Sequence, residues 1–134
     1  MEHEIIFDAD FCKITYEPHI NLLIVKWLRH PTNEEHKEVF LKGLEAIKKY
    51  NIVKLITDMR KIGIVAQANK AWLTKDIIPQ AKEYGIKCVA VILDHDTFKK
   101  HYLDQLATSF NEHEIHFKTF DDNTSEAIDW ILKK

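Results

Sequence analysis

The carboxylates that could do chemistry follow two predicted strands. Asp58 ends one apolar run, and Asp94 and Asp96 come after another, residues 88–93. Because the carboxyl ends of parallel strands meet at one edge of a sheet, these three groups could form a divalent-cation site or an acid–base pair. A metal-dependent or phosphoryl-handling enzyme is therefore one hypothesis. The alternative is structural: Asp58 pairs with Arg60, and Asp96 caps a helix.

The patterns expected of a nucleophile or a zinc site are weak. The two serines, Ser109 and Ser125, lie in helical segments and outside any Gly-x-Ser-x-Gly turn. Cys88 begins a buried strand, where a thiol is usually an inert hydrophobe. His113 and His116 span the start of a strand, where an odd offset points the two rings to opposite faces. The sequence thus predicts no catalytic residue, no metal ligand and no cofactor.

The segment after Asp58 is apolar where a connecting loop is usually polar. Lys61-Ile-Gly-Ile-Val65 carries three β-branched residues, so it either covers the core or offers a patch for a partner or a lipid. Trp72 follows this loop and would line an apolar ligand cavity or belong to the core. The candidate binding residues are Asp58, Arg60, Ile62, Gly63, Ile64, Val65 and Trp72.

Composition narrows the function classes. The chain has 134 residues, a net charge of −2, and three Gly and three Pro. A chain with such a balanced charge is not expected to attract nucleic acid or an anionic membrane. So little Gly and Pro excludes a flexible linker and a glycine-rich phosphate cradle. Two distant cysteines are expected to be reduced thiols, and no signal peptide or membrane-length apolar run is seen, which predicts a cytoplasmic protein without a transmembrane segment.

Hydrophobic patterning predicts the strands that would position these residues. They are residues 12–16, 22–28, 53–58, 88–93 and 114–120. The first two form an antiparallel hairpin, because Pro18 and Asn21 suit a turn between them. The run 88–93 does not alternate, which is typical of a strand buried on both faces and predicts the centre of the sheet.

Helical periodicity and capping signals predict the helices. They run from the capping box of Thr32 and Glu35 to Tyr50, from 66 to 84, from Asp96 to Phe110, and from Asn123 onward. Asn51 is expected to end the first helix, and Gly43 lies in its apolar stripe, where it would permit close packing. Pro79 predicts a kink or a break in the second helix.

The element order predicts the fold class. The order ββαβαβαβα indicates an α/β fold, with an N-terminal β-hairpin followed by βα units that cross over with a right hand. The sheet is then mixed and mostly parallel, and helices cover it. We expect a single domain over residues 1–134, in which residues 1–10 form a loose N-terminal segment.

Four segments carry a family resemblance. They are Leu23-Ile-Val-Lys-Trp27, Leu55-Ile-Thr-Asp-Met-Arg60, Trp72 with Ile77-Ile-Pro-Gln-Ala81, and Gly85-Ile-Lys-Cys-Val-Ala-Val91. With them, the chain from Cys12 to Lys134 resembles the SpoIIAA-like branch of the STAS superfamily, named for sulfate transporters and anti-sigma-factor antagonists. The resemblance implies a small βα superhelix with strands in largely sequential order.

The same resemblance bears on function. Anti-sigma-factor antagonists carry a phosphorylatable Ser at the start of the helix after the strand that ends here in Asp58. Residues 59–69 contain no Ser or Thr, so regulation by Ser phosphorylation is not expected. The resemblance implies a non-catalytic binding or regulatory domain. It would contact a protein partner, or a small apolar or lipid-like ligand, through the loop between Asp58 and Trp72, the loop after the third predicted strand. A homodimer through the hairpin or this loop is a further hypothesis.

Overall fold

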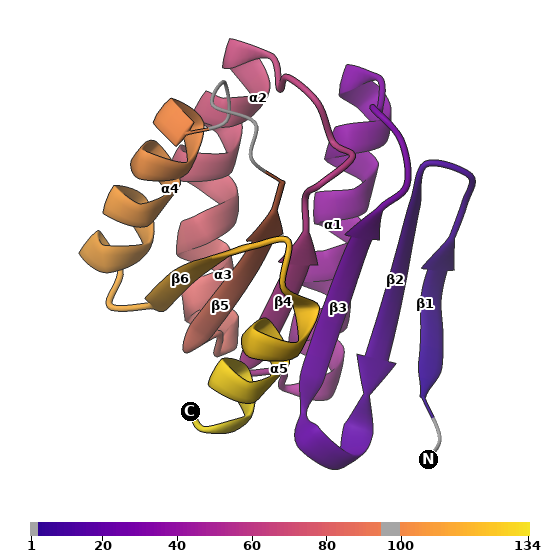
Figure 1. The fold of residues 1–134 in the computed structure, drawn as a ribbon, viewed down its shortest axis with the longest axis vertical. Helices are drawn as coiled ribbons and strands as arrows, with labels where there is room; N and C mark the ends of the chain where they lie inside the picture. The colour runs from indigo at the N-terminus through magenta and orange to yellow at the C-terminus, as the bar shows by residue number, and fades with distance from the viewer. Residues whose placement is uncertain (1–2, 95–99) are drawn as a thin grey trace.

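The computed structural model describes residues 3–94 and 100–134, which form a six-stranded sheet (Figure 1). Its strands are β1 (Glu4–Asp8), β2 (Cys12–Glu17), β3 (Leu22–Trp27), β4 (Lys54–Asp58), β5 (Cys88–Leu93) and β6 (His116–Asp121). They pair in chain order. The pairs β1–β2 and β2–β3 are antiparallel and the others are parallel. The predicted α/β class and mixed sheet are confirmed, and the strand order is the sequential one that the resemblance implies.

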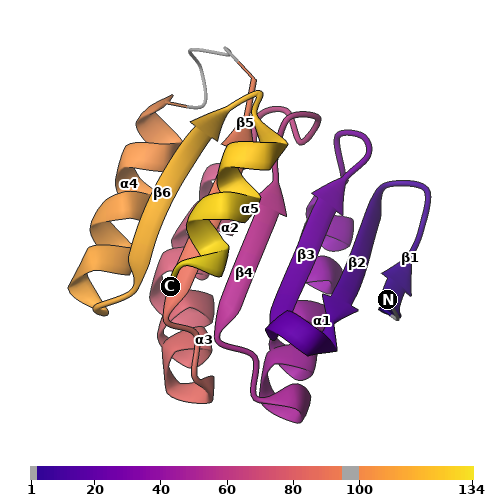
Figure 2. The same ribbon diagram turned by 60° about the horizontal axis from the view of Figure 1, so that its bottom comes forward.

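Helices lie on both sides of this sheet. They are α1 (Asn33–Tyr50), α2 (Gln67–Trp72), α3 (Ile78–Tyr84), α4 (Lys100–Glu112) and α5 (Thr124–Leu132). Figure 2 shows α1, α3 and α4 on one face, which we call the helical face, and α5 on the other. Within the described residues, no helix has the length and apolar character that a membrane span requires. The predicted cap at Asp96 lies outside those residues.

Strand β1 corrects the expectation of a loose N-terminal segment for residues 4–8. Its Ile6 and Phe7 pack against the core of the helical face. Tyr50 of α1 donates a hydrogen bond of 2.8 Å from its hydroxyl to the Glu4 carboxylate. Residues 4–8 are therefore held both by strand pairing with β2 and by contact with α1. A register shift between Ile5 and Phe7 interrupts its alternation, which is why the sequence pattern did not predict a strand.

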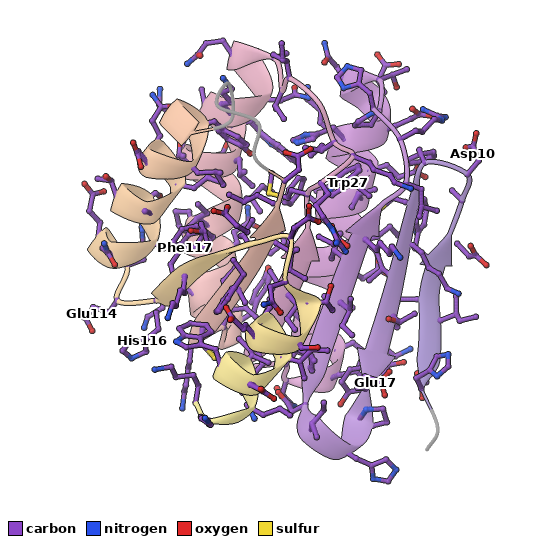
Figure 3. All side chains as sticks on the ribbon, in the orientation of Figure 1. Asp10, Glu17, Trp27, Glu114, His116 and Phe117 are labelled. Atoms are coloured by element: carbon purple, nitrogen blue, oxygen red, sulfur yellow. The ribbon has the colours of Figure 1, made fainter. Side chains whose placement is uncertain are left out.

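The ends of α1 follow the predicted capping signals. Thr32 and Glu35 form a reciprocal capping box, and Asn51 ends the helix in the left-handed conformation with φ of 54°. Arg29 ties this start to the hairpin, because its guanidinium pairs with Glu35 at 3.0 Å and with Asp10 at 3.2 Å. Figure 3 shows Asp10 at the turn between β1 and β2. The sequence thus determined where α1 begins and ends.

The predicted helix over 66–84 is interrupted one turn earlier than expected. A π-helical turn, Leu73–Ile77, separates α2 from α3, and Pro79 lies in the first turn of α3. Proline has no N–H and its ring crowds the carbonyl four residues before it, so the preceding turn widens to accommodate the ring. The break was predicted correctly, but its position was not.

The position of β5 is the second correction. It lies next to β6, one strand from the edge, and not at the centre of the sheet. Its residues are nevertheless buried on both sides, because the helical face covers Val89 and Val91 while α5 covers Ala90 and Ile92. The unbroken apolar run therefore indicates that helices cover both faces of the strand. It does not indicate that the strand lies at the centre of the sheet.

Candidate functional site

A three-way ionic cluster lies at the carboxyl end of β4. Arg60 donates from Nη2 to Asp58 Oδ2 at 2.7 Å and from Nε to Asp58 Oδ1 at 3.0 Å. The Arg60 backbone N–H donates to the same carboxylate. Its other terminal nitrogen, Nη1, contacts Asp122 at 3.0 Å, and Nη2 contacts the Thr124 hydroxyl at 3.3 Å. The guanidinium thus joins the end of β4 to the start of α5.

The surroundings of Asp58 keep it ionised. Burial alone would raise the pKa of this carboxyl, but the hydrogen bonds from Arg60 outweigh burial, and Lys26 on the adjacent strand adds to their effect. The pKa of Asp58 is therefore below its usual value. A general base near neutral pH needs a pKa close to 7. Asp58 is accordingly placed to orient Arg60 and the following loop, as the structural alternative anticipated.

The metal hypothesis gains no geometric support. In the described part of the chain, no three His, Cys, Asp or Glu side chains converge on a common point. Asp94 follows β5 at the same edge as Asp58, whereas Asp96 lies outside the described residues. His113 Nδ1 instead lies 2.8 Å from the Ser109 carbonyl oxygen, a local helix-end contact. The phosphoryl or metal reading therefore rests on the sequence pattern alone.

The apolar loop after β4 is split between the core and the surface. The Ile62 side chain is fully buried and Val65 is nearly so, whereas Ile64 is 71% exposed. His30 fixes the loop, because its Nδ1 donates to the Ile62 carbonyl oxygen at 2.6 Å. Gly63 adopts a φ of +75°, and a Cβ there would lie 2.7 Å from His30 Nδ1. The loop is thus a closely fitted cover with one projecting apolar side chain.

Trp72 belongs to an aromatic cluster on the helical face. Its ring meets Phe40 edge-on at 6.3 Å, and Phe40 lies 4.8 Å from the His36 ring. His36 in turn stacks on Trp27 at 5.6 Å. Trp72 is half-buried and packs against the core. Of the two readings that the sequence left open, the structure places Trp72 in this cluster and not in the lining of the cavity described below.

His36 is a buried polar residue that the sequence did not single out. Burial, reinforced by the nearby His30, lowers its pKa to about 4. The Asn69 side-chain amide donates to His36 Nδ1 at 3.4 Å, which leaves the ring proton on Nε2. That nitrogen has no hydrogen-bond partner among the described residues. The ring is therefore held neutral between aromatic neighbours, which suits a structural role for it in the cluster.

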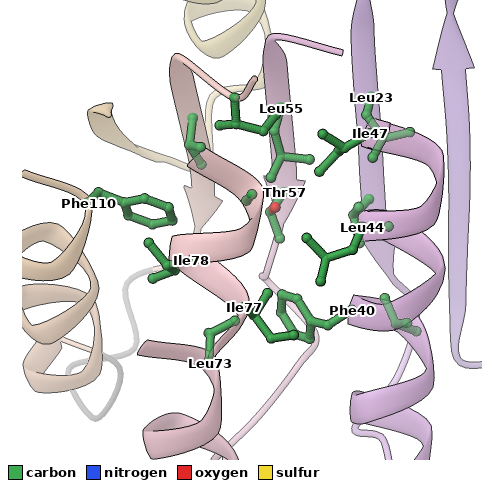
Figure 4. A pocket seen from close by; sticks show the side chains of 16 residues that line it. Leu23, Phe40, Leu44, Ile47, Leu55, Thr57, Leu73, Ile77, Ile78 and Phe110 are labelled. Carbon is green, nitrogen blue, oxygen red and sulfur yellow. The ribbon is translucent and has the colours of Figure 1, made fainter. Parts of the chain in front are cut away.

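An apolar cavity of about 60 Å³ lies between the sheet and the helices of the helical face (Figure 4). Its floor comprises β3, β4 and β5, one wall is α1, and the other is the π-helical turn with α3. The walls include Phe40, Leu44, Leu73 and Ile77. Gly43 also lines it, and a Cβ built there would meet no atom within 4 Å. Gly43 therefore leaves open space and does not serve the close packing that the sequence suggested.

Thr57 is the one polar side chain among the residues that line this cavity. It lies on β4, one residue before Asp58. None of the seven candidate binding residues lines the cavity, although the loop they form connects its floor to one of its walls. Two features of the sequence relate to the cavity: a glycine in the apolar stripe of α1, and the interruption before α3. Neither predicts a cavity by itself, because the cavity forms only where α1 and α3 face each other over the sheet.

No family model, curated protein or solved structure matches the chain. The assignment of function therefore rests on the geometry. A wider groove between α2 and α4 is lined by polar surface side chains such as Gln67, Lys75 and Glu112. The apolar cavity differs from it, because its lining is the interior of the domain.

Proposed function

We propose that this chain is a non-catalytic, STAS-like binding domain that takes a small apolar ligand into the cavity between α1, α3 and the sheet. The observation that carries this proposal is the lining, which is apolar except for Thr57 and includes a helical glycine facing open space. The sequential strand order supports the STAS-like part of the proposal. Both carboxylate oxygens of Asp58 accept hydrogen bonds from Arg60, which supports a role without catalysis.

Two local costs coincide at this cavity. An empty apolar volume destabilises a fold by roughly 24 cal/mol per Å³, which is about 1.4 kcal/mol for about 60 Å³. A glycine inside a helix costs about 1 kcal/mol relative to alanine. Alanine at position 43 would reduce both costs, since its methyl group has room. A bound ligand would fill the cavity and so remove the cost of the empty volume.

The predicted loop has a supporting role in this proposal. The Arg60–Asp58 contacts and the His30–Ile62 hydrogen bond hold the chain between β4 and α2. Because that chain leads into the π-helical turn, the loop sets the position of the wall that carries Leu73. The seven candidate residues therefore position the cavity and do not contact its contents.

The test is binding of xenon, an apolar probe small enough for this volume, followed through methyl signals in ¹H–¹³C NMR. We expect the Leu44 and Ile77 signals to shift on addition of xenon, while those of Ile131, on the α5 face, stay in place. Gly43→Leu fills the cavity and should abolish these shifts. Leu41→Ala, a change on the exposed side of the same helix, should leave them intact.

Two results would contradict the proposal. One is a parent chain whose cavity methyl signals do not shift at a saturating pressure of xenon. The other is a folded Gly43→Leu variant that binds xenon as well as the parent chain does. A thermal melt of each variant confirms that it is folded before binding is compared.

A protein partner is the second candidate function, and the exposure of Ile64 favours it. At 71% exposed, Ile64 stands out from a loop whose other apolar side chains are buried. We expect Ile64→Asp to weaken capture of a partner from cell lysate while the thermal melt stays almost unchanged. Equal capture by Ile64→Asp and by the parent chain would remove this candidate.

The cysteines support a reducing, cytoplasmic location. Cys12 and Cys88 are both buried free thiols. Burial raises the pKa of Cys12 to about 12 and also raises that of Cys88, so neither forms a reactive thiolate near neutral pH. Labelling with a thiol reagent in intact cells and after unfolding tests this point: label should enter only after unfolding.

A further inference from the structure

The face of the sheet that carries α5 is only half covered. Helix α5 makes its main contacts with β4, β5 and β6. Figure 2 shows α5 in front of that half and, among the described elements, no helix in front of β1, β2 and β3. We call the β1–β3 part of this face the open half-sheet. Most of its side chains are exposed or half-buried, namely Ile5, Asp8, Lys13, Thr15, Glu17, Ile24 and Lys26.

Two lysines face each other on the open half-sheet. Lys13 and Lys26 are directly opposite in the β2–β3 pair, where like charges destabilise a sheet. Neither forms an ion pair among the described residues. Lys26 lies next to Asp58, but both oxygens of that carboxylate accept hydrogen bonds from Arg60. A carboxylate from another molecule, placed between the two lysines, would remove their repulsion.

The outer side of α5 carries such a carboxylate. Ala127 and Ile131 are buried and point toward the sheet. Because a helix has 3.6 residues per turn, Asp129 lies on the opposite side, and it is exposed. Asp129 forms no ion pair among the described residues. This side of α5 therefore has an uncompensated charge opposite in sign to that of the open half-sheet.

The flank of α5 next to the open half-sheet is apolar. Trp130 packs against Phe120 of β6 with a ring separation of 6.0 Å, so the other flank of the helix is directed toward β3. That flank carries Ile128, which packs against the core of this face, and Leu132, which is 43% exposed. An apolar strip thus continues from α5 toward Ile24 on the sheet.

We propose that α5 of a second copy of this chain covers the open half-sheet, in a symmetric dimer whose two-fold axis runs parallel to the strands. The two α5 helices then lie side by side between the two sheets. Leu132 of one protomer packs against the apolar row of its partner, Ile5, Thr15 and Ile24, and Asp129 approaches Lys13 and Lys26. Each protomer both gives a helix and receives one, so a single contact satisfies the charges and the apolar strip of both copies.

The position of α5 along the strands fits this arrangement. The helix begins at the carboxyl end of β4, where Arg60 Nη2 contacts the Thr124 hydroxyl at 3.3 Å. Lys26 pairs with the last residue of β4 and so lies at the same end. A two-fold axis parallel to the strands preserves this level in the partner. Asp129 follows Thr124 by about 7 Å along the helix axis, a distance that an extended lysine side chain can span.

The size of the surface predicts a weak, reversible dimer. Three strands of about six residues have a flat outline of roughly 14 by 20 Å, and the outer side of α5 adds roughly 140 Å². Over two protomers the outlines amount to roughly 800 Å², and the relief of the side chains makes the accessible area larger. Stable interfaces begin at about 1,200 Å² in total. We therefore expect a dissociation constant in the micromolar range or weaker.

Sedimentation velocity over a range from about 10 μM to about 1 mM tests the proposal. We expect the parent chain to form dimers as its concentration rises. Lys13→Glu and Asp129→Lys should each raise the dissociation constant about tenfold, because each turns an attraction into a repulsion twice in a symmetric dimer. The double variant restores opposite charges and should return to within about threefold of the parent chain. Lys37→Glu is the matched control, since Lys37 is exposed on α1, on the other face of the sheet.

Three results would overturn this interface. The first is a parent chain that stays monomeric over the whole range, which would leave the open half-sheet to a helix of a different protein. The second is a dimer that Lys13→Glu and Asp129→Lys weaken no more than Lys37→Glu does. The third is a double variant that is as weak as the product of the two single changes. Thermal melts of all variants show that they are folded, and the cavity on the helical face plays no part in any of these outcomes.

Discussion

The burial of His36 predicts that the fold loses stability as the pH falls from about 6.5 toward 4. Burial, and to a smaller degree the nearby His30, lowers the pKa of His36 from its ordinary 6.5 to about 4. Between these two values the unfolded chain binds a proton that the folded chain does not, so acid favours unfolding. Each pH unit in this window costs about 1.4 kcal/mol. At pH 5 the loss is about 2 kcal/mol, and at pH 4 it is about 3 kcal/mol.

Urea unfolding at pH 7, 6 and 5 measures this loss. His36→Phe keeps an aromatic ring between Trp27 and Phe40 but cannot take up a proton. We therefore expect its unfolding free energy to fall by about 2 kcal/mol less than that of the parent chain between pH 7 and pH 5. His19→Gln is the matched control, because His19 lies exposed in the turn between β2 and β3.

The reasoning on His36 is refuted if the parent chain and His36→Phe lose the same stability between pH 7 and pH 5. The ion pair of Asp58 and Arg60 does not contribute to this difference in stability between pH 7 and pH 5. The pKa of Asp58 lies below its ordinary 3.8, so the stability that this carboxylate contributes is present above that pH and is lost only in stronger acid. The two groups thus act in separate pH ranges.

Three substitutions test the remaining contacts, each by urea unfolding. Gly43→Ala should raise the unfolding free energy by about 1 kcal/mol, because alanine favours helix and its methyl group has room; a lower value would show that the space is not open. Gly63→Ala should lower it by about 1–2 kcal/mol, owing to the φ of +75° and the contact with His30, and an unchanged value would contradict that strain. Asp58→Asn should lower it by about 2 kcal/mol at pH 7 through loss of charged hydrogen bonds to Arg60, and a smaller loss below pH 3.8 is the check on this cause.

Local signals in the sequence predicted much of the fold. The capping box of Thr32 and Glu35 and the left-handed Asn51 fixed the limits of α1, because each satisfies backbone groups within a few residues. The β-hairpin and β5 were likewise visible as short apolar runs. Strand β1 was missed, since its register shift breaks the two-residue period on which strand prediction depends.

The candidate site was harder to predict, because it depends on contacts between distant segments. The pairing of Asp58 with Arg60 was predicted correctly, but no pattern in the sequence indicated that Asp122 would join them. The loop pattern did not show which isoleucine would face inward, Ile62 or Ile64. The cavity needs α1 and α3 to lie side by side over the sheet, and no short segment encodes that arrangement.

The sequential order of the strands has a consequence for how the chain can fold during synthesis. Each strand pairs with the one made just before it, so the partner of every new strand has already left the ribosome. Loop closure between neighbours in sequence is less costly than closure between distant segments. The contacts of α1 with β1 and those of α5 with β4 and β5 reach further back along the chain. The sheet can therefore grow vectorially from the N-terminus, with α5 closing its second face last.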